Sequence, residues 1–214
     1  MELIHLKGNT YYIKSVVNIG LYKMSTNKCL LIDSGFSGKY AIELVDFLKS
    51  IKIDVIAVIN THGHRDHMGG NYLLKKEFGS LIYASKFEDT FIERPDLASM
   101  FVHPSAPFTS FKNVHIEGSK VDYIVDEHEK LTIDKIDFNI INLAGHSPNQ
   151  IGVVTPDDVF FTADAYVCKS ELEQMKILFS YDLTKDLECK KRMLTMKHSI
   201  YLPSHGKPTK NISV

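Results

Sequence analysis

The sequence is poor in cysteine and has neither a long apolar run nor an excess of one charge. Its three cysteines, Cys29, Cys168 and Cys189, are far apart and form no CxxC pair, which argues against a zinc ribbon or a dithiol redox centre. No apolar stretch is long enough to cross a membrane, and the start of the chain does not read as a signal peptide. These features predict a cytoplasmic protein with free thiols and no membrane partner.

Charge is balanced, with 25 basic and 26 acidic residues in a chain of 214. Neither sign gathers into a block that could follow a phosphate backbone, so we expect a small-molecule substrate and not nucleic acid. Hydrophobic residues make up 44% of the sequence, which is enough for a sizeable core. A chain of this length predicts a single domain over residues 1–214.

Short apolar or alternating segments predict strands, and longer segments with helical spacing predict helices. The predicted helices cover 39–51, 70–78 and 184–196, and Gly79 is expected to end the second. Strands are predicted within 10–24, 28–35, 55–60, 81–85, 121–127, 136–145 and 199–206, and a hairpin joins 151–154 to 159–165. Strands interspersed with helices in two similar halves predict two packed sheets with helices outside.

The segment 95–118 is rich in loop-forming residues, prolines and phenylalanines. Two interpretations are open: an aromatic flap over the functional site, or a loop that packs on its own small core. The residues concerned are Phe101, Pro104, Pro107, Phe108 and Phe111.

The densest chemical feature is a segment that places three histidines and an aspartate within six positions, at His62, His64, Asp66 and His67. A polar, solvated loop is the simplest alternative interpretation. Imidazole and carboxylate together suit zinc or a similar divalent ion, and side chains two positions apart on an extended turn can converge on one ion. Two such ligands leave an ion under-coordinated, so other parts of the chain must supply more.

Three further polar residues stand where apolar runs end, a position typical of functional loops on a rigid scaffold. They are His146 in LAGHSP, Asp164 in FFTADAY and His205 in LPSHGKP. Each alone would be interpreted as a capping or hydrogen-bonded loop residue. Together with the histidine-rich segment they predict a metal centre. Cys168, four residues after Asp164, could approach it but is more simply a small buried apolar residue.

These motifs resemble those of the metallo-β-lactamase superfamily, whose five sequence motifs match in order at Asp33, 62–67, His146, Asp164 and His205. The resemblance covers most of the chain and implies an α/β fold, a four-layer αββα sandwich. It implies little about the substrate, because the superfamily contains hydrolases, nucleases and oxygen-using enzymes.

Carried over residue by residue, the resemblance implies two divalent metal ions, with zinc expected first and iron or manganese as alternatives. One ion would have an all-histidine set of ligands: His62, His64 and His146. The other would have a mixed set: Asp66, His67 and His205. Asp164 would bridge the two ions. Asp33 would support the ligand loop by hydrogen bonding, as carboxylates behind metal ligands commonly do, although its DSG sequence is also ordinary turn chemistry.

Departures from the family bear on the substrate. Superfamily β-lactamases carry cysteine or serine where this chain has Asp164, which disfavours antibiotic hydrolysis and favours a compact member similar to glyoxalase II, a lactonase or a phosphodiesterase. Full glyoxalase II has a further helical domain for its glutathione ester, whereas this chain ends nine residues after His205. The third motif reads GHSPNQ, which is expected to bring Asn149 and Gln150 near the metals.

Two divalent ions roughly 3.5–4 Å apart would lower the pKa of a shared water and supply hydroxide as the nucleophile. Asp66 is the candidate catalytic residue, since a carboxylate there could orient the water or pass a proton to the leaving group. We therefore expect hydrolysis of a thioester, ester or lactone. The alternatives are a persulfide dioxygenase with a single iron, a phosphodiesterase, and a metal-binding protein without catalysis.

Overall fold

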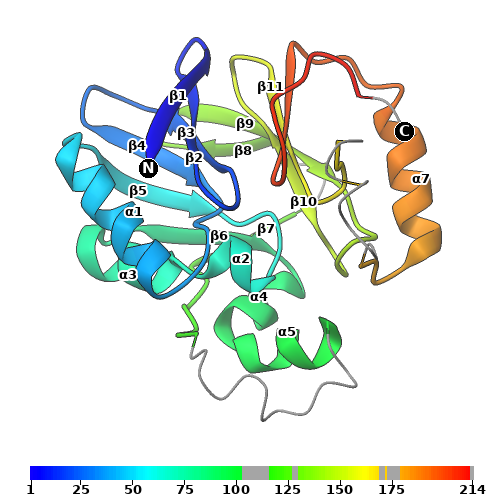
Figure 1. The fold of residues 1–214 in the computed structure, drawn as a ribbon, viewed down its shortest axis with the longest axis horizontal. Coiled ribbons are helices and arrows are strands. Elements are labelled where there is room, and N and C mark those ends of the chain that lie inside the picture. The colour runs from blue at the N-terminus through cyan, green and yellow to red at the C-terminus, as the bar shows by residue number, and fades with distance from the viewer. Residues whose placement is uncertain (103–115, 127–129, 169–171, 173–178, 213–214) are drawn as a thin grey trace.

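The computed structural model describes residues 1–102, 116–126, 130–168, 172 and 179–212. Its strands form two sheets that lie face to face (Figure 1). The larger sheet follows chain order: β1 (Glu2–Lys7), β2 (Thr10–Lys14), β3 (Ile19–Lys23), β4 (Lys28–Ile32), β5 (Asp54–Ile59), β6 (Leu81–Ser85) and β7 (Tyr123–Val125). The smaller sheet has the order β12 (Ile200–Pro203), β11 (Val159–Ala163), β10 (Ile151–Val154), β9 (Ile136–Asn142) and β8 (Lys130–Ile133).

Helices cover the outer face of each sheet, on opposite sides of the molecule (Figure 1). Those on the larger sheet are α1 (Lys39–Ser50) and α3 (Asn71–Phe78), and α7 (Leu183–Met193) covers the smaller sheet. The shorter helices α2 (Arg65–Met68), α4 (Glu88–Glu93) and α5 (Pro95–Val102) lie in the connections after β5 and β6. None of the described helices combines the length and the apolar character that a membrane span requires.

Three groups of buried apolar side chains fill the spaces between the layers. The first joins α1 and α3 to the larger sheet, the second lies between the sheets, and the third joins the smaller sheet to α7. In β4, Leu31 packs towards the helices while Leu30 and Ile32 pack towards the other sheet, because successive strand residues point to opposite faces. In β11, Phe161 lies between the sheets and Phe160 faces α7. The predicted αββα sandwich is therefore confirmed.

One edge of the sandwich gathers strand ends from both sheets. β4 runs parallel to β5, and β11 runs parallel to β12, so within each pair the carboxyl ends lie side by side. Backbone hydrogen bonds join the sheets there, from Ile151 N to Thr61 O at 2.9 Å and from Asn18 N to Ser204 O at 2.9 Å. Loop residues that follow these strands consequently meet at this edge.

Most predicted elements agree with the structure. The helices predicted over 39–51, 70–78 and 184–196 correspond to α1, α3 and α7, and the predicted hairpin is formed by β10 and β11. Gly79 ends α3 with a φ of +70°, a left-handed conformation that glycine adopts without steric strain.

The predicted loop over 95–118 is wrong at its start, where α5 forms. Pro95 occupies the first helical position, which suits proline because its missing N–H would have no helical partner there. β1, β8 and α4 were not predicted, because each is at most six residues long and the two strands leave much of their length exposed. The proposed aromatic flap falls mainly on residues 103–115, outside the described residues.

Candidate metal centre

The histidine-rich segment forms a turn after β5 and then α2. His64 has an extended backbone and directly precedes the helix, so His62 and His64 lie on the turn while Asp66 and His67 lie on the helix. The side chains of His62 and His67 are fully buried, and their ring centroids are 4.0 Å apart. The segment is thus a buried polar cluster and not a solvated loop.

The other candidate ligands follow strands of the smaller sheet: His146 after β9, Asp164 directly after β11 and His205 after β12. With the histidine-rich segment they form three groups, and within each group the ligand atoms are all within 4.8 Å of one another. The groups are His62–His64–His146, which we call the three-histidine set; Asp66–His67–His205, the mixed set; and His62–His67–Asp164. All seven residues predicted from the sequence therefore lie in one cluster.

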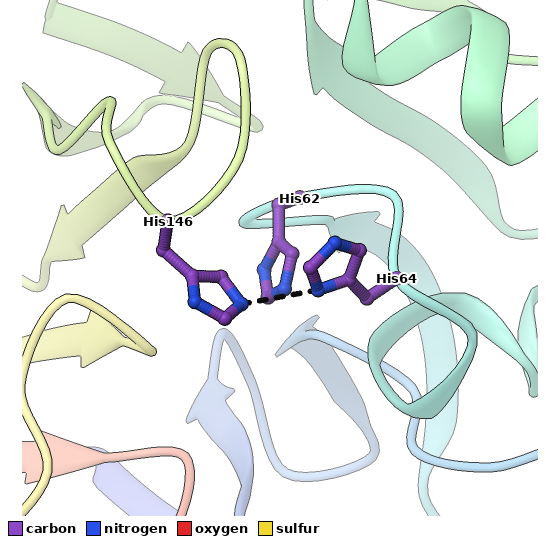
Figure 2. Close-up of side chains that lie close together, drawn as sticks. All are labelled: His62, His64 and His146. Carbon is purple, nitrogen blue, oxygen red and sulfur yellow. Dashed lines mark hydrogen bonds between the residues drawn. The ribbon is translucent and has the colours of Figure 1, made fainter. Parts of the chain in front are cut away.

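Figure 2 shows the three-histidine set, whose rings converge from two separate loops. One ligand from each loop meets the other, with His64 Nδ1 3.1 Å from His146 Nε2. The edge of the Phe179 ring borders both of these imidazoles, with centroids 5.6 Å from His64 and 5.8 Å from His146. One side of this set is therefore apolar.

Asp164 lies between the two predicted ligand sets. Its Oδ1 is 3.5 Å from His67 Nε2, while its Oδ2 is 3.3 Å from His146 Nε2 and 3.8 Å from His205 Nε2. Asp66 completes the mixed set, with its Oδ2 3.6 Å from the Nε2 atoms of His67 and His205. A single carboxylate, that of Asp164, consequently faces ligands of both sets.

Several buried atoms of the cluster lack the hydrogen bond that burial normally requires. Among the described residues, no hydrogen-bond partner is present for His62 Nε2, His67 Nε2 or Asp164 Oδ1. Buried polar atoms without a hydrogen bond are costly. His67 Nε2 and Asp164 Oδ1 lie 3.5 Å from each other, and a metal ion would use the lone pairs of all three atoms. Imidazole nitrogens and carboxylate oxygens in this number fit divalent ions of the first transition row.

Neighbouring groups orient the histidine rings for such a role. Thr61 Oγ1 lies 3.1 Å from His62 Nδ1, and the carbonyl oxygen of Phe179 accepts a hydrogen bond from His146 Nδ1 at 3.0 Å. When Nδ1 of a ring is occupied in this way, Nε2 remains free to bind a metal ion.

Asp33 supports the cluster from the end of β4. Its Oδ1 accepts a hydrogen bond from Thr61 N, and its Oδ2 accepts from Thr61 Oγ1 and His67 Nδ1, each at 2.8 Å. Its φ of +63° is a left-handed conformation that aspartate adopts more readily than most residues. Both interpretations of Asp33 therefore hold, since it is a turn residue that also orients the ligand loop.

Burial and repulsion between neighbouring imidazoles keep the three-histidine set neutral. They lower the pKa of His62 well below its usual value and that of His64 to about 3. Burial also lowers the pKa of His146, against the opposing effect of Asp164. Neutral imidazoles are the form that binds metal ions.

The mixed set has the opposite electrostatic balance. Burial disfavours a charged His67, but the carboxylates of Asp164, Asp66 and Asp33 outweigh it and raise the pKa of His67. Burial likewise opposes ionisation of Asp164, yet His67 lowers the pKa of that carboxyl well below its usual value. The carboxylates are therefore ionised at neutral pH, as metal ligands must be.

Several residues that position the cluster were not predicted. Asn60 Nδ2 donates to His67 O at 3.1 Å, Asn71 Nδ2 donates to Asn60 Oδ1 at 2.7 Å, and Ser34 Oγ donates to Asn71 Oδ1 at 2.7 Å. Glu88 is buried in α4 and accepts hydrogen bonds from both ligand-bearing loops. Only Asn60 carried a signal in the sequence, because it adjoins the histidine-rich segment.

Asn149 and Gln150, which were expected near the metals, have side chains that hydrogen-bond to backbone carbonyl groups. Asn149 Nδ2 donates to Lys86 O at 3.2 Å, and Gln150 Nε2 donates to Leu143 O at 3.4 Å, so both side chains belong to the framework around the cluster. Cys168 is partly buried against the third apolar group and joins none of the ligand groups found among the described residues. None of the three cysteines, all of which lie among the described residues, forms a disulfide, in agreement with the prediction of thiols.

Comparison with known proteins gives a family and several relatives. A family model described as the metallo-beta-lactamase superfamily matches residues 13–205. The hydroxyacylglutathione hydrolase GloC of Haemophilus influenzae is 30% identical over 131 residues, which are 59% of this chain and 57% of that protein. The exodeoxyribonuclease WalJ of Streptococcus pneumoniae is 24% identical over 160 residues, 71% of this chain and 56% of that protein. The chain thus spans little more than half the length of these relatives.

Solved structures share the fold at low sequence identity. The BLEG-1 B3 metallo-beta-lactamase superposes with a TM-score of 0.70 at 21% identity, covering 90% of this chain and 88% of that one. This likeness shows the fold alone, because one fold can host many activities. The family model, by contrast, matches from β2 to the last candidate ligand. The chain belongs to the metallo-beta-lactamase superfamily.

Proposed function

We propose that this chain is a metal-dependent hydrolase that binds two divalent ions. The observation that carries the proposal is the position of Asp164, which faces the three-histidine set and the mixed set at once. A site for one ion would leave Asp66, His67 and His205, whose ligand atoms lie within 4.8 Å of one another, without an ion to bind. Zinc is the first candidate for both sites, with iron and manganese as alternatives.

Two ions in such a centre supply a water of lowered pKa and polarise the oxygen of the bond under attack. The residues of the chain hold and orient the reacting groups. The three-histidine set would hold one ion and the mixed set the other, with Asp164 shared between them. Burial opposes ionisation of Asp66, but His67 and His205 lower its pKa, so its carboxylate is ionised and can accept a hydrogen bond that orients the attacking water. The same carboxylate is our candidate for passing a proton to the leaving group.

We propose a thioester, ester or lactone as the substrate. This proposal rests on the likeness to GloC, whose name specifies a hydroxyacylglutathione, and on the aspartate at position 164. Recognition of glutathione itself is not carried over, because this chain spans little more than half of that relative. A carbonyl ester needs only a water nucleophile and a polarised oxygen, which the centre would provide.

We further propose that residues 1–214 form one domain that acts in the cytoplasm on a small molecule, with no nucleic-acid or membrane partner. The shared apolar core between the sheets supports one domain, and the balance of 25 basic and 26 acidic residues supports a small substrate. The likeness to WalJ makes phosphodiester cleavage the alternative that an assay must include.

Metal analysis of protein purified without added metal tests the two-ion proposal. We expect two ions per chain, loss of activity on chelation and recovery on addition of zinc or manganese. A fully occupied structure that holds one ion, with His67 and His205 directed away from it, would overturn the proposal.

A substrate panel assayed without oxygen tests the type of reaction. We expect turnover of a thioester such as a lactoylated thiol, or of an ester or lactone, and little turnover of a phosphodiester or of single-stranded DNA. A parallel assay should measure oxygen uptake with a persulfide. Oxygen consumption by the iron-loaded protein, with no hydrolysis of any member of the panel, would decide for a dioxygenase.

A further inference from the structure

A buried glutamate in α4 connects the two loops that carry the three-histidine set. Glu88 has no solvent exposure, and it accepts three hydrogen bonds. Its Oε2 accepts from Gly63 N at 2.8 Å, and its Oε1 accepts from Ser147 Oγ at 2.7 Å and Asn149 N at 2.9 Å. Gly63 lies between two of the histidines, and Ser147 directly follows the third.

The two loops belong to different sheets, so their spacing is not set by one ladder of strand hydrogen bonds. The first loop follows β5 in the larger sheet, and the second joins β9 to β10 in the smaller sheet. A contact of 3.1 Å between His64 Nδ1 and His146 Nε2 spans this junction. A small shift of one loop would therefore change the ligand geometry directly.

Helix α4 also packs tightly against the first loop. A side chain at Gly63 would place its Cβ 2.5 Å from Phe91 Cβ, which is closer than Cβ atoms approach in proteins, and 3.1 Å from the carbonyl oxygen of Glu88, which is a tight contact. The glycine thus lets the helix approach the loop closely enough for the carboxylate to reach its backbone N–H.

The carboxylate is costly to bury, and its three partners are neutral donors. Burial raises the pKa of Glu88, against the lowering effect of its hydrogen bonds to Ser147, Asn149 and Gly63. A buried carboxylate that stabilised only α4 would have no need to bond to both ligand loops.

We infer that Glu88 is a positioning residue that sets the spacing between the loops at 62–64 and 146–149, and thereby presets the three-histidine set for its metal ion. The inference rests on the metal centre of the proposed function. Asp33 bonds directly to a histidine of the mixed set and, through Thr61, also supports the loop that carries His62, whereas Glu88 bonds only to the two loops of the three-histidine set.

Substitution of Glu88 by glutamine tests this inference, because the amide keeps the shape but can no longer accept at both ends. Glu88→Gln should be combined with His205→Ala, which disables the mixed set, and separately with His146→Ala, which disables the three-histidine set. Zn²⁺ affinity is then measured by competition with a chromophoric chelator, and Co²⁺ absorption reports the coordination. In the His205→Ala background we expect Glu88→Gln to weaken Zn²⁺ binding by about 10–100-fold, which is typical of losing a hydrogen-bond partner behind a metal ligand. In the His146→Ala background we expect it to weaken Zn²⁺ binding by less than about threefold.

Glu93→Gln is a matched control, because Glu93 is also in α4 and accepts a backbone N–H, that of Val121 at 2.9 Å, away from the ligand loops. It should change Zn²⁺ affinity in neither background. If Glu88→Gln does not fold, Ser147→Ala removes a single hydrogen bond and should weaken Zn²⁺ binding in the His205→Ala background roughly three- to tenfold.

The outcomes separate this inference from the proposed function. Folded Glu88→Gln with unchanged affinity, or with the same loss in both backgrounds, would overturn the positioning role and leave the metal centre intact. If Glu88→Gln does not fold, an unchanged Zn²⁺ affinity of Ser147→Ala in the His205→Ala background would likewise overturn the positioning role. Failure of both single-set backgrounds and of the unsubstituted chain to bind Zn²⁺ or Co²⁺ would overturn both proposals together.

Discussion

A few carboxylates give the cluster its chemistry at the scale of single residues. Asp164 contacts the region between the ligand sets, with its oxygens 3.3–3.8 Å from the nitrogens of three histidines. Asp33 lies behind the rings and bonds to His67 and Thr61. One aspartate would therefore bind metal ions directly, while the other would orient the residues that do. Substitutions can separate these two tasks.

Replacing Asp164 by alanine should abolish turnover and leave the chain folded. The residue would supply charge to the ions and does not fill the apolar core, so we expect activity to fall at least about a hundredfold, beyond the range seen for partners behind the ligands. Activity, metal content and circular dichroism measure these effects. Asp137→Ala, which removes an exposed partner of Lys130, is the control and should retain activity. Near-normal turnover of Asp164→Ala with full metal content would rule out a bridging role.

Replacing Asp33 by asparagine should weaken metal binding without disturbing the backbone. Asparagine tolerates the φ of +63° at this position, but an amide nitrogen in place of Oδ2 can accept a hydrogen bond from neither Thr61 Oγ1 nor His67 Nδ1. We expect a loss of about 10–100-fold in metal affinity, concentrated in the mixed set. Zn²⁺ competition in the His146→Ala and His205→Ala backgrounds checks this, and equal affinities before and after the substitution would contradict it.

At the scale of elements, the strand pairs must be held in register for their ends to bring the ligands together. Asp158, in the turn between β10 and β11, bonds to the segment that leads into β12. Its Oδ1 accepts from His198 Nδ1 at 2.7 Å, and its Oδ2 accepts from Ser199 N at 2.8 Å and from Ser199 Oγ at 2.6 Å. These bonds lie at the ends of β11 and β12 opposite to Asp164 and His205. They should therefore affect stability more than chemistry.

Asp158→Asn should lower the free energy of unfolding by about 1 kcal/mol, which is less than the roughly 1.5–3 kcal/mol typical of hydrogen bonds to a charged group, because the side chain is 46% exposed and screened by solvent. Asparagine again accepts the left-handed φ of +60°. Urea unfolding of both proteins measures the difference, and metal affinity should stay unchanged. A stability equal to that of the unsubstituted chain would show that the turn does not depend on these bonds.

The same pair of proteins should show a defined pH dependence. Burial raises the pKa of Asp158, but hydrogen bonds from Ser199 and His198 outweigh it and hold the value below the usual 3.8. A carboxyl whose pKa is lower in the folded state contributes stability above its unfolded pKa and loses it as the pH falls through the folded pKa. The stability difference should therefore be complete near neutral pH and shrink below pH 3.8. A difference that grows on acidification would contradict this assignment.

At the scale of the whole molecule, the metal centre lies where the two sheets meet. Four of its candidate ligands follow β5 in the larger sheet, and His146, Asp164 and His205 follow strands of the smaller sheet. Ions bound there would connect the two halves. Without them, among the described residues, His62 Nε2 is buried with no hydrogen-bond partner, which is costly.

Removing metal should consequently destabilise the whole fold. An ion that binds only the folded state, at a hundredfold excess over its Kd, adds about 2.7 kcal/mol of stability. We expect chelation to lower the thermal midpoint by several degrees, and Zn²⁺ to restore it. Asp164→Ala provides the comparison, since its midpoint should respond less to chelator. A midpoint of the unsubstituted chain that does not change with chelator or Zn²⁺ would argue against a metal centre in the folded protein.

The layers and the kinds of ligand could be predicted from the sequence because both are local patterns. The continuous apolar run Leu30, Leu31 and Ile32 indicates a strand with two buried faces, and the helical spacing of apolar residues from 39 to 51 indicates α1. The three histidines and the aspartate of 62–67 indicate a metal site because they stand within six positions. The same approach failed for α5, because a proline at the first helical position reads equally well as part of a loop.

The sequence by itself determined the fold class and the seven candidate ligands, whereas the tertiary structure decided how they are held. Only the fold shows that Asp164 faces both ligand sets, that the carbonyl of Phe179 orients His146, and that Glu88 bonds to both ligand loops. The reason is physical. Periodicity and residue type can be recognised from the order of residues alone. The hydrogen bonds of Glu88, by contrast, join residues 25 and 59 positions apart, so they depend on the packing of distant segments and produce no periodic pattern in the sequence.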